Sequence, residues 1–188
     1  MNIMIVGVGG QGTLLTSRII GKTALSAGYD VKISEVHGMA QRGGSVVTYV
    51  RYGERVNEPT VEEGGADILL AFEKLEALRY AHYLKKDGIL IVNDREIEPM
   101  TVIIGASEYP ENILEKLQKE HTMYAINGEE IARGLGNAKV LNSVVLGLAA
   151  KYMEFSKDAW LNELQKTVPP KTIDLNVKAF LVGYGDED

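Results

Sequence analysis

The spacing of apolar and polar residues changes several times along the chain, and each change predicts a strand or a helix. Residues 2–6 form a short, continuous apolar run that is typical of a buried strand. Over residues 11–27 the apolar side chains recur at intervals of about four and five, which predicts a helix that ends at Gly28. Two strands are then predicted, one from the alternation at 29–36 and one from the β-branched run at 45–53.

Strands and helices continue to alternate through the middle of the chain, and the C-terminal part is helical. The elements predicted there are strands over 66–72, 89–94, 101–106 and 122–127, and helices over 73–86, 110–121, 129–135 and 141–155. Pro169 and Pro170 separate two further helices at the C-terminus. This order predicts an α/β fold, a Rossmann-like three-layer sandwich with a mostly parallel sheet, helices on both faces and a helical C-terminus. We expect one domain over residues 1–188.

The second and third predicted strands are too close in sequence to be parallel neighbours. Residues 37–44 alone lie between them, whereas a parallel crossover usually needs about a dozen residues including a helix. We therefore expect these strands to pair antiparallel or to separate at an edge of the sheet. Glu35 is a candidate for the ribose-binding acid of an NAD site, but this connection leaves the second half of such a site incomplete.

A glycine-rich turn joins the first predicted strand to the first predicted helix. Gly7, Gly9 and Gly12 have the spacing G-x-G-x-x-G, with Gly10 and Gln11 inside it. Glycine permits positive φ and close approach of the backbone, and the free N–H groups at a helix start favour an anion. The pattern in this position predicts a site for a phosphate or another anionic group. The alternative is a tight turn in which the glycines serve packing alone.

A second shaped loop follows the second predicted strand, within the sequence EVHGMAQRGGSV. Its glycines exclude a helix, and His37, Gln41 and Arg42 offer donors for carbonyl, carboxylate or phosphate groups. If the loop projects from the carboxyl end of that strand, it lies beside the glycine-rich turn, at the sheet edge where α/β proteins bind ligands. The alternatives are a backbone-bonded histidine at His37 and a surface or interface salt bridge at Arg42.

Composition narrows the possible chemistry. The 188 residues include no cysteine, which excludes disulfides, a thiol nucleophile and iron–sulfur or zinc sites ligated by cysteines of this chain. The three histidines lack metal-ligand spacing, so we expect no metal site. The net charge of −6 argues against nucleic-acid binding, although bases outnumber acids over residues 1–53, which suits a small anion. We find no membrane-spanning stretch and no secretory signal, and therefore expect a cytoplasmic protein.

Three motifs together resemble those of a known family. GVGGQG follows the first predicted strand, EVHGMAQRGGSV includes the second loop, and NSVVLGL lies at 142–148 in a late predicted helix. Over essentially the whole chain the sequence resembles the gamma-type subunits of 2-oxoacid:ferredoxin oxidoreductases, and most closely the beta subunits of indolepyruvate ferredoxin oxidoreductases. Val145, Leu148, Ala149 and Tyr152 fall on one face of that helix, which indicates core packing. The alternative is that Asn142 and Ser143 cap the helix near the crevice.

The resemblance implies a subunit of an enzyme and not a complete catalyst. A larger partner would hold thiamine diphosphate, magnesium and iron–sulfur clusters, decarboxylate an aryl pyruvate, reduce ferredoxin and transfer the acyl group to coenzyme A. This chain would bind none of those cofactors alone and would help to enclose the coenzyme A phosphates or the substrate carboxylate. We expect no nucleic-acid or membrane partner, and we assign no catalytic residue.

The candidate binding residues come from the two loops, which would form an electropositive recess at one rim of the sheet. They are Gly7, Gly9, Gly10, Gln11, Gly12, His37, Gln41, Arg42, Gly43, Gly44 and Ser45. Two other functions are compatible with the sequence: a stand-alone NAD(P)-binding oxidoreductase and a nucleotide-binding assembly protein without catalysis.

Overall fold

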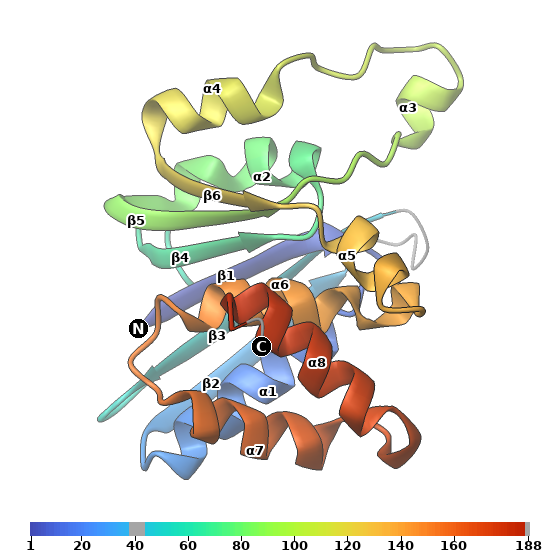
Figure 1. The fold of residues 1–188 in the computed structure, drawn as a ribbon. Coiled ribbons are helices and arrows are strands. Elements are labelled where there is room, and N and C mark those ends of the chain that lie inside the picture. Colours follow the sequence, from blue (N-terminus) through green and yellow to red (C-terminus); the bar gives the residue numbers. More distant parts are fainter. Residues whose placement is uncertain (38–43, 187–188) are drawn as a thin grey trace.

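A six-stranded sheet forms the centre of the molecule in the computed structural model, which describes residues 1–37 and 44–186 (Figure 1). The strands are β1 (Asn2–Val8), β2 (Asp30–His37), β3 (Ser45–Gly53), β4 (Ala66–Ala71), β5 (Leu84–Asn93) and β6 (Thr122–Ile126). Their order across the sheet is β2-β3-β1-β4-β5-β6. The neighbours among β1, β4, β5 and β6 are parallel, whereas β3 pairs antiparallel with both β1 and β2.

Helices cover both faces of this sheet. They are α1 (Thr13–Ser26), α2 (Lys74–Tyr80), α3 (Met100–Ile103), α4 (Ile113–Glu120), α5 (Gly128–Gly134), α6 (Leu141–Ala150), α7 (Lys157–Thr167) and α8 (Ile173–Tyr184). Figure 1 shows α2 and α4 on one face and α1, α6, α7 and α8 on the other. The predicted α/β sandwich with a helical C-terminus is therefore confirmed. Within the two described ranges, no helix combines the length and the apolar character needed to cross a membrane.

The short connection after β2 gives the antiparallel pairing that its length predicts. β2 and β3 pair from Asp30 opposite Gly53 to His37 opposite Val46, and β2 is an edge strand. β3 then continues beside β1. The carboxyl ends of β1 and β2 therefore meet the start of β3 at one end of the sheet. We call this end of the sheet, where β4, β5 and β6 also finish, the rim.

The strand predicted at 101–106 is wrong, because this segment begins with the single-turn helix α3. Val102 N–H donates to Pro99 O at 2.9 Å, and Ile104 N–H donates to Met100 O at 3.0 Å. These local bonds use the groups that a sheet ladder would require. Met100 and Ile104 are exposed, so the apolar run does not enter the core. Apolar composition alone therefore gave the wrong element here.

Two predicted helices are shorter than their patterns indicate. The helix predicted at 73–86 is α-helical to Tyr80 and continues as a 3₁₀ turn over Ala81–Tyr83, because Leu84 already pairs with β4 as the first residue of β5. The helix predicted at 141–155 ends at Ala150, where the chain turns toward α7. In both cases the apolar residues beyond the helix end serve the next element or turn, so the pattern continues although the helix does not.

An apolar core lies on each side of the sheet. The core beneath α1, α6, α7 and α8 includes Trp160 and Phe180, both fully buried. The core beneath α2 and α4 includes Leu69 and Ile113. Each such side chain stabilises the fold by about 1.5–3 kcal/mol through removal of apolar surface from water. The two cores hold the sheet between the helices, which fixes the rim on which the site is built.

The helices α6 and α8 cross with their backbones in contact. A Cβ atom at Gly147 would overlap the Phe180 carbonyl oxygen, and a Cβ atom at Gly183 would overlap the Val144 carbonyl oxygen. Glycine is therefore required at both positions of the crossing. Because Gly147 belongs to the motif NSVVLGL, part of that motif is explained by packing.

Candidate functional site

The glycine-rich turn lies at the rim between β1 and α1, with several N–H groups unpaired. Gly10 and Gly12 have φ angles of 97° and 84°, in the left-handed region that favours glycine. Gly12 is the N-cap of α1. Within the described residues, the N–H groups of Gly10, Gly12, Thr13 and Leu14 have no acceptor. These donors lie at the positive end of the α1 dipole, where an anion is favoured.

The side chain of Gln11 braces the turn from within. Its Oε1 accepts from Val8 N–H at 2.6 Å, and its Nε2 donates to the Phe72 carbonyl at 2.9 Å. Asn93, at the end of β5, donates to the same carbonyl at 3.1 Å. A Cβ atom at Gly7 would lie 2.8 Å from Gln11 Oε1, so Gly7 makes room for this brace. Gln11 therefore uses its amide for the chain itself, and its predicted contact with a ligand has no support from these bonds.

The two loops predicted to frame one crevice lie side by side where the structure describes them. Gly9 N–H donates to Gly44 O at 3.0 Å, which joins the first turn to the end of the second loop. His37 is the last residue of β2 and so reaches the same rim. Three predicted binding residues lie outside the described residues, and their contribution stays a prediction. These are Gln41, Arg42 and Gly43.

Ser45, the last predicted binding residue, is held by a buried carboxylate. Its Oγ donates to Glu76 Oε2 at 2.5 Å and lies 3.2 Å from the Tyr80 hydroxyl. Glu76 is almost completely buried, and Arg79 Nη1 donates to its other oxygen at 2.8 Å. Burial raises the pKa of Glu76, against the opposing effect of Ser45 and Arg79. The Ser45 hydroxyl thus fixes the end of the second loop onto α2.

A cavity of about 410 Å³ opens on the β2 side of the glycine-rich turn, and we call it the β2-side recess. It is lined by Gly9, Gly10, Gly12, Thr13, Leu14, Glu35 and Val46. The Glu35 carboxylate accepts from Thr48 Oγ1 at 3.3 Å. The described lining thus includes one carboxylate and no basic side chain. The positive charge expected at this rim is not found on this side of the described chain.

A second cavity, of about 260 Å³, opens on the opposite side of the same turn, and we call it the α6-side recess. It is lined by Gly10, Gln11, Gly12, Arg95, Ala138, Lys139, Leu141 and Asn142. Two cations, Arg95 and Lys139, therefore face the turn from the ends of β5 and of the segment before α6. The positive charge of the described rim is on this side.

The Asn142 side chain closes the α6-side recess against the turn. Asn142 and Ser143 lie in the first turn of α6, whose N-cap is Val140, so the capping alternative is wrong and the buried helix face is confirmed. A Cβ atom at Gly12 would lie 2.8 Å from Asn142 Nδ2. The neighbouring Ser143 turns away, and its Oγ donates to Asn176 Oδ1 at 2.7 Å. Within the motif NSVVLGL, Asn142 thus lines the site, whereas Ser143 and Gly147 contact α8.

The sequence interpretation missed both cations of the α6-side recess. Arg95 follows the carboxyl end of β5, the position at which parallel sheets place ligand-binding groups, so that rule identifies it once the strand is recognised. Lys139 offers no comparable signal, because it precedes α6 in a segment far along the chain from the glycines. Only the fold brings it to the turn.

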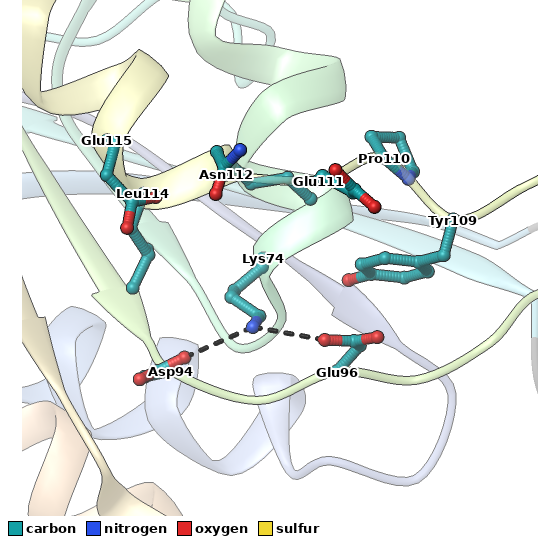
Figure 2. Close-up of a pocket in the computed structure, with 10 residues that line it drawn as sticks. Lys74, Asp94, Glu96, Tyr109, Pro110, Glu111, Asn112, Leu114 and Glu115 are labelled. Carbon is teal, nitrogen blue, oxygen red and sulfur yellow. Dashed lines mark ion pairs between the residues drawn. The ribbon is translucent and has the colours of Figure 1, made fainter.

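A third cavity, of about 450 Å³, lies at the end of β5 beneath α4 and has a different charge (Figure 2). Lys74 Nζ lies 3.4 Å from Asp94 Oδ1 and 3.2 Å from Glu96 Oε2. Burial lowers the pKa of Lys74, but the two carboxylates outweigh it and raise that pKa overall. The only lysine that lines this cavity is thus charged but balanced by two carboxylates. The cavity therefore does not suit an anion. No group of three potential metal ligands occurs in the described part of the chain.

The comparisons with known proteins agree with these motifs. The family model of pyruvate ferredoxin/flavodoxin oxidoreductase matches residues 2–185. The indolepyruvate oxidoreductase subunit IorB of Thermococcus kodakarensis is 44% identical over 188 residues, which cover 97% of this chain and 93% of that protein. A keto/oxoacid ferredoxin oxidoreductase gamma subunit from Geobacter sulfurreducens has a TM-score of 0.73 at 26% identity, covering 98% of this chain and 96% of that one.

The same fold also occurs inside a longer chain. A 2-oxoglutarate:ferredoxin oxidoreductase from Magnetococcus marinus matches 98% of this chain with a TM-score of 0.75 and 19% identity, but over only 30% of its own length. The resemblance predicted from the three motifs is confirmed by the family model and the IorB relatives. This chain belongs to the pyruvate ferredoxin/flavodoxin oxidoreductase family, among the small subunits of 2-oxoacid oxidoreductases.

Proposed function

We propose that this chain is the small subunit of an indolepyruvate ferredoxin oxidoreductase in the cytoplasm. The complex would decarboxylate aryl pyruvates oxidatively to acyl-coenzyme A and pass the electrons to ferredoxin. The observation that carries the proposal is the 44% identity to a protein named as an indolepyruvate oxidoreductase subunit, over nearly the full length of both chains. A relative from Methanothermobacter thermautotrophicus with the same name is 39% identical.

The chemistry is divided between this chain and a larger partner. Iron–sulfur clusters need thiolate ligands, and this chain has no cysteine, so its residues do not fit a cluster. The clusters are therefore assigned to the partner. Membership of the family is the ground for assigning thiamine diphosphate, magnesium and the contact with ferredoxin to the same partner. A protein's share in cofactor chemistry is binding, orientation and electrostatics, and this chain supplies that share at its rim.

The rim is suited to hold an anionic group beside a partner's active site. The glycine-rich turn presents unpaired N–H groups from Gly10 to Leu14, and Gly44 fixes the second loop next to them. Arg42 belongs to that second loop and would add a charged donor. We assign to this arrangement the enclosure of the coenzyme A phosphates or of the substrate carboxylate.

The proposal is tested by reconstitution. The chain is mixed with the larger, cysteine-bearing subunit, and dye reduction is measured with indolepyruvate and coenzyme A. Neither chain alone should be active, and the mixture should be active. Arg42→Ala should slow turnover without dissociating the complex, whereas the control Arg55→Ala, on an exposed residue after β3, should not. Hydride transfer from NADH by the isolated chain, or a mixture without activity, would contradict the proposal.

A further inference from the structure

We infer that residues 97–109, which we call the α3 arm, dock this chain onto the larger, cysteine-bearing subunit through the apolar side chains of α3. The arm leaves the rim after β5, and Figure 1 shows α3 beyond the ends of the strands, apart from α2 and α4. No step of the proposed function uses this segment. The inference rests on the proposed function only for the identity of the partner.

The tip of the α3 arm is apolar and lies outside both cores. Met100, Ile103 and Ile104 are 67%, 61% and 68% exposed, the highest values among the large apolar side chains that the structure describes. Their spacing of i, i+3 and i+4 places them on one side of the helical turn. Neither core includes any of them. Neighbouring apolar side chains that the fold leaves in water indicate a surface that a partner covers.

The backbone of the tip has a defined shape. The Gly105 N–H group donates to the Val102 carbonyl at 2.9 Å, and the Ala106 N–H group donates to the Thr101 carbonyl at 2.8 Å. Gly105 has a φ angle of 73°, so the two bonds form a Schellman motif that ends α3. A turn that is already hydrogen-bonded loses less conformational entropy when it binds. The apolar side of α3 is therefore presented in a form suited to a groove.

One buried carboxylate fixes both ends of the α3 arm to the start of α2. Glu73 is 1% exposed, and its Oε1 accepts from Ile97 N–H at 3.2 Å and from the Tyr109 hydroxyl at 2.5 Å. Its Oε2 accepts from Glu76 N–H at 2.9 Å, which makes Glu73 the N-cap of α2. Burial and the Glu73 carboxylate raise the pKa of Tyr109, so its hydroxyl stays a donor at neutral pH. The base of the arm is thus part of the fold, although its tip is not.

The charge of this segment identifies the kind of partner. Residues 96–111 include four glutamates and no basic residue. Glu98 and Glu108 are exposed and make no ion pair within residues 1–37 and 44–186. An apolar tip with acidic borders fits an apolar groove with basic edges. Two copies of this chain that met through their α3 arms would bring acidic borders together, so a different chain is favoured.

The position of the arm selects the larger subunit as that chain. In the proposed function the rim lies beside the active site of the larger subunit. The α3 arm leaves the same rim at the end of β5. One continuous interface would therefore include both the rim and the apolar tip.

The test measures association of the full chain with the purified larger subunit, its cofactors in place, by biolayer interferometry. Ile103→Ser and Ile104→Ser each remove exposed apolar surface and should weaken association at least about tenfold. Leu25→Ser is the matched control, because Leu25 is 57% exposed near the end of α1, away from the rim, and it should have no effect. Circular dichroism verifies that each variant is folded.

Two charge reversals test the acidic borders of the arm. Glu98→Lys and Glu108→Lys should each weaken association about fivefold. Glu54→Lys, on an exposed residue after β3 at the opposite end of the sheet, should leave it unchanged. Unchanged affinity in both arm variants would overturn the basic edges assigned to the partner's groove.

Dye reduction by the reconstituted complex separates docking from a part in the reaction. Ile103→Ser should raise the concentration of this chain that gives half-maximal activity at least about tenfold. The maximal rate at saturating concentration should be unchanged, because the arm only docks. A lower maximal rate at unchanged affinity would overturn the inference.

The outcomes distinguish this inference from the proposed function. Equal affinities of Ile103→Ser and the unmodified chain, or equal weakening in Leu25→Ser, overturn the docking surface, even if the complex is active. Self-association that Ile103→Ser abolishes, at unchanged affinity for the larger subunit, assigns the arm to a second copy and also overturns it. Association that depends on Ile103 supports the inference, even if indolepyruvate gives no dye reduction, which overturns the proposed function alone. An unmodified chain that does not bind the larger subunit overturns both.

Discussion

The rim at the glycine-rich turn and the contact between α6 and α8 both depend on glycine, but they differ in what surrounds it. At the α6–α8 contact, Gly147 allows backbone packing, and the polar side chains nearby are paired, as Ser143 Oγ is with Asn176. At the rim, Gly12 allows α1 to approach Asn142, and donors around it have no acceptor in the described chain. The difference teaches that glycine indicates close approach in both regions, whereas only the rim combines it with backbone donors at a cavity.

The largest effect is expected at the α6–α8 contact. Gly147→Val would place side-chain carbons where the Phe180 carbonyl lies, so the two helices must separate. Forced overpacking of this kind should cost more than about 3 kcal/mol of unfolding free energy. Urea unfolding followed by circular dichroism measures it. The control is Gly134→Ala at the end of α5, where no described part of the chain beyond its own helix backbone and chain neighbours lies within 4 Å of the new Cβ, and it should be neutral or slightly stabilising.

A smaller loss of unfolding free energy is expected at the rim. Alanine substitutions of two glycines with positive φ distinguish there between backbone strain and a side-chain contact. Gly10→Ala brings the new Cβ within 4 Å of no residue that the structure describes and should cost only the left-handed conformation, about 1–2 kcal/mol. Gly12→Ala has the same type of φ and also approaches Asn142 Nδ2 at 2.8 Å. It should therefore be less stable than Gly10→Ala. Equal urea midpoints of the two variants would show that the contact with Asn142 has no energetic role.

The smallest effect concerns two buried carboxylates, Glu76 at the rim and Glu163 on α7, whose pKa values are shifted in opposite directions. Burial raises the pKa of Glu76 beside Ser45 at the rim. Lys166 lowers the pKa of Glu163 on α7, against burial and with help from Ser26. When the carboxyl pKa is higher in the folded state, the free energy of unfolding falls as pH rises from the unfolded-state pKa through the folded-state pKa. A lowered pKa means that stability is present above the unfolded value and is lost as pH falls.

Glutamine substitutions at these positions should therefore respond oppositely to pH. From about pH 4 to about pH 7, Glu76→Gln should gain stability relative to the unmodified chain, because it avoids ionising a buried group. As pH rises from about 3 to about 5, Glu163→Gln should lose stability relative to the unmodified chain, because it lacks the charge that Lys166 favours. Urea unfolding at a series of pH values gives both differences. Parallel trends in the two variants would contradict the assigned shifts.

The periodicity of the sequence was sufficient for the sheet and for most helices, because the strands are buried and the helices have one apolar face. It was also sufficient for the antiparallel start of the sheet, because residues 37–44 are too few for a crossover. It was insufficient at α3, where apolar residues lie exposed and carry no information about a core. The spacing of apolar residues therefore predicts a helix or a strand only where those residues are buried in the core.

The sequence predicted the glycine-rich turn of the candidate site but not the roles of the side chains around it. The glycine-rich turn has a local signal, since its spacing and its place after a strand can be read from consecutive residues. The roles of Gln11 and Ser45 could not be read in this way, because their partners, Phe72 and Glu76, are distant in sequence. Lys139 reaches the turn only through the position of α6 in the fold. Long-range placement determines which predicted residues face a ligand and which brace the chain.

The position of Trp160 has a practical consequence. It is the only tryptophan of the chain, is fully buried on α7, and packs edge-on against Phe155 with ring centroids 5.6 Å apart. Its indole N–H has no partner in the described residues. Indole emission is shifted to shorter wavelengths in such apolar surroundings. Intrinsic fluorescence will thus follow loss of the helical layer that buries this side chain.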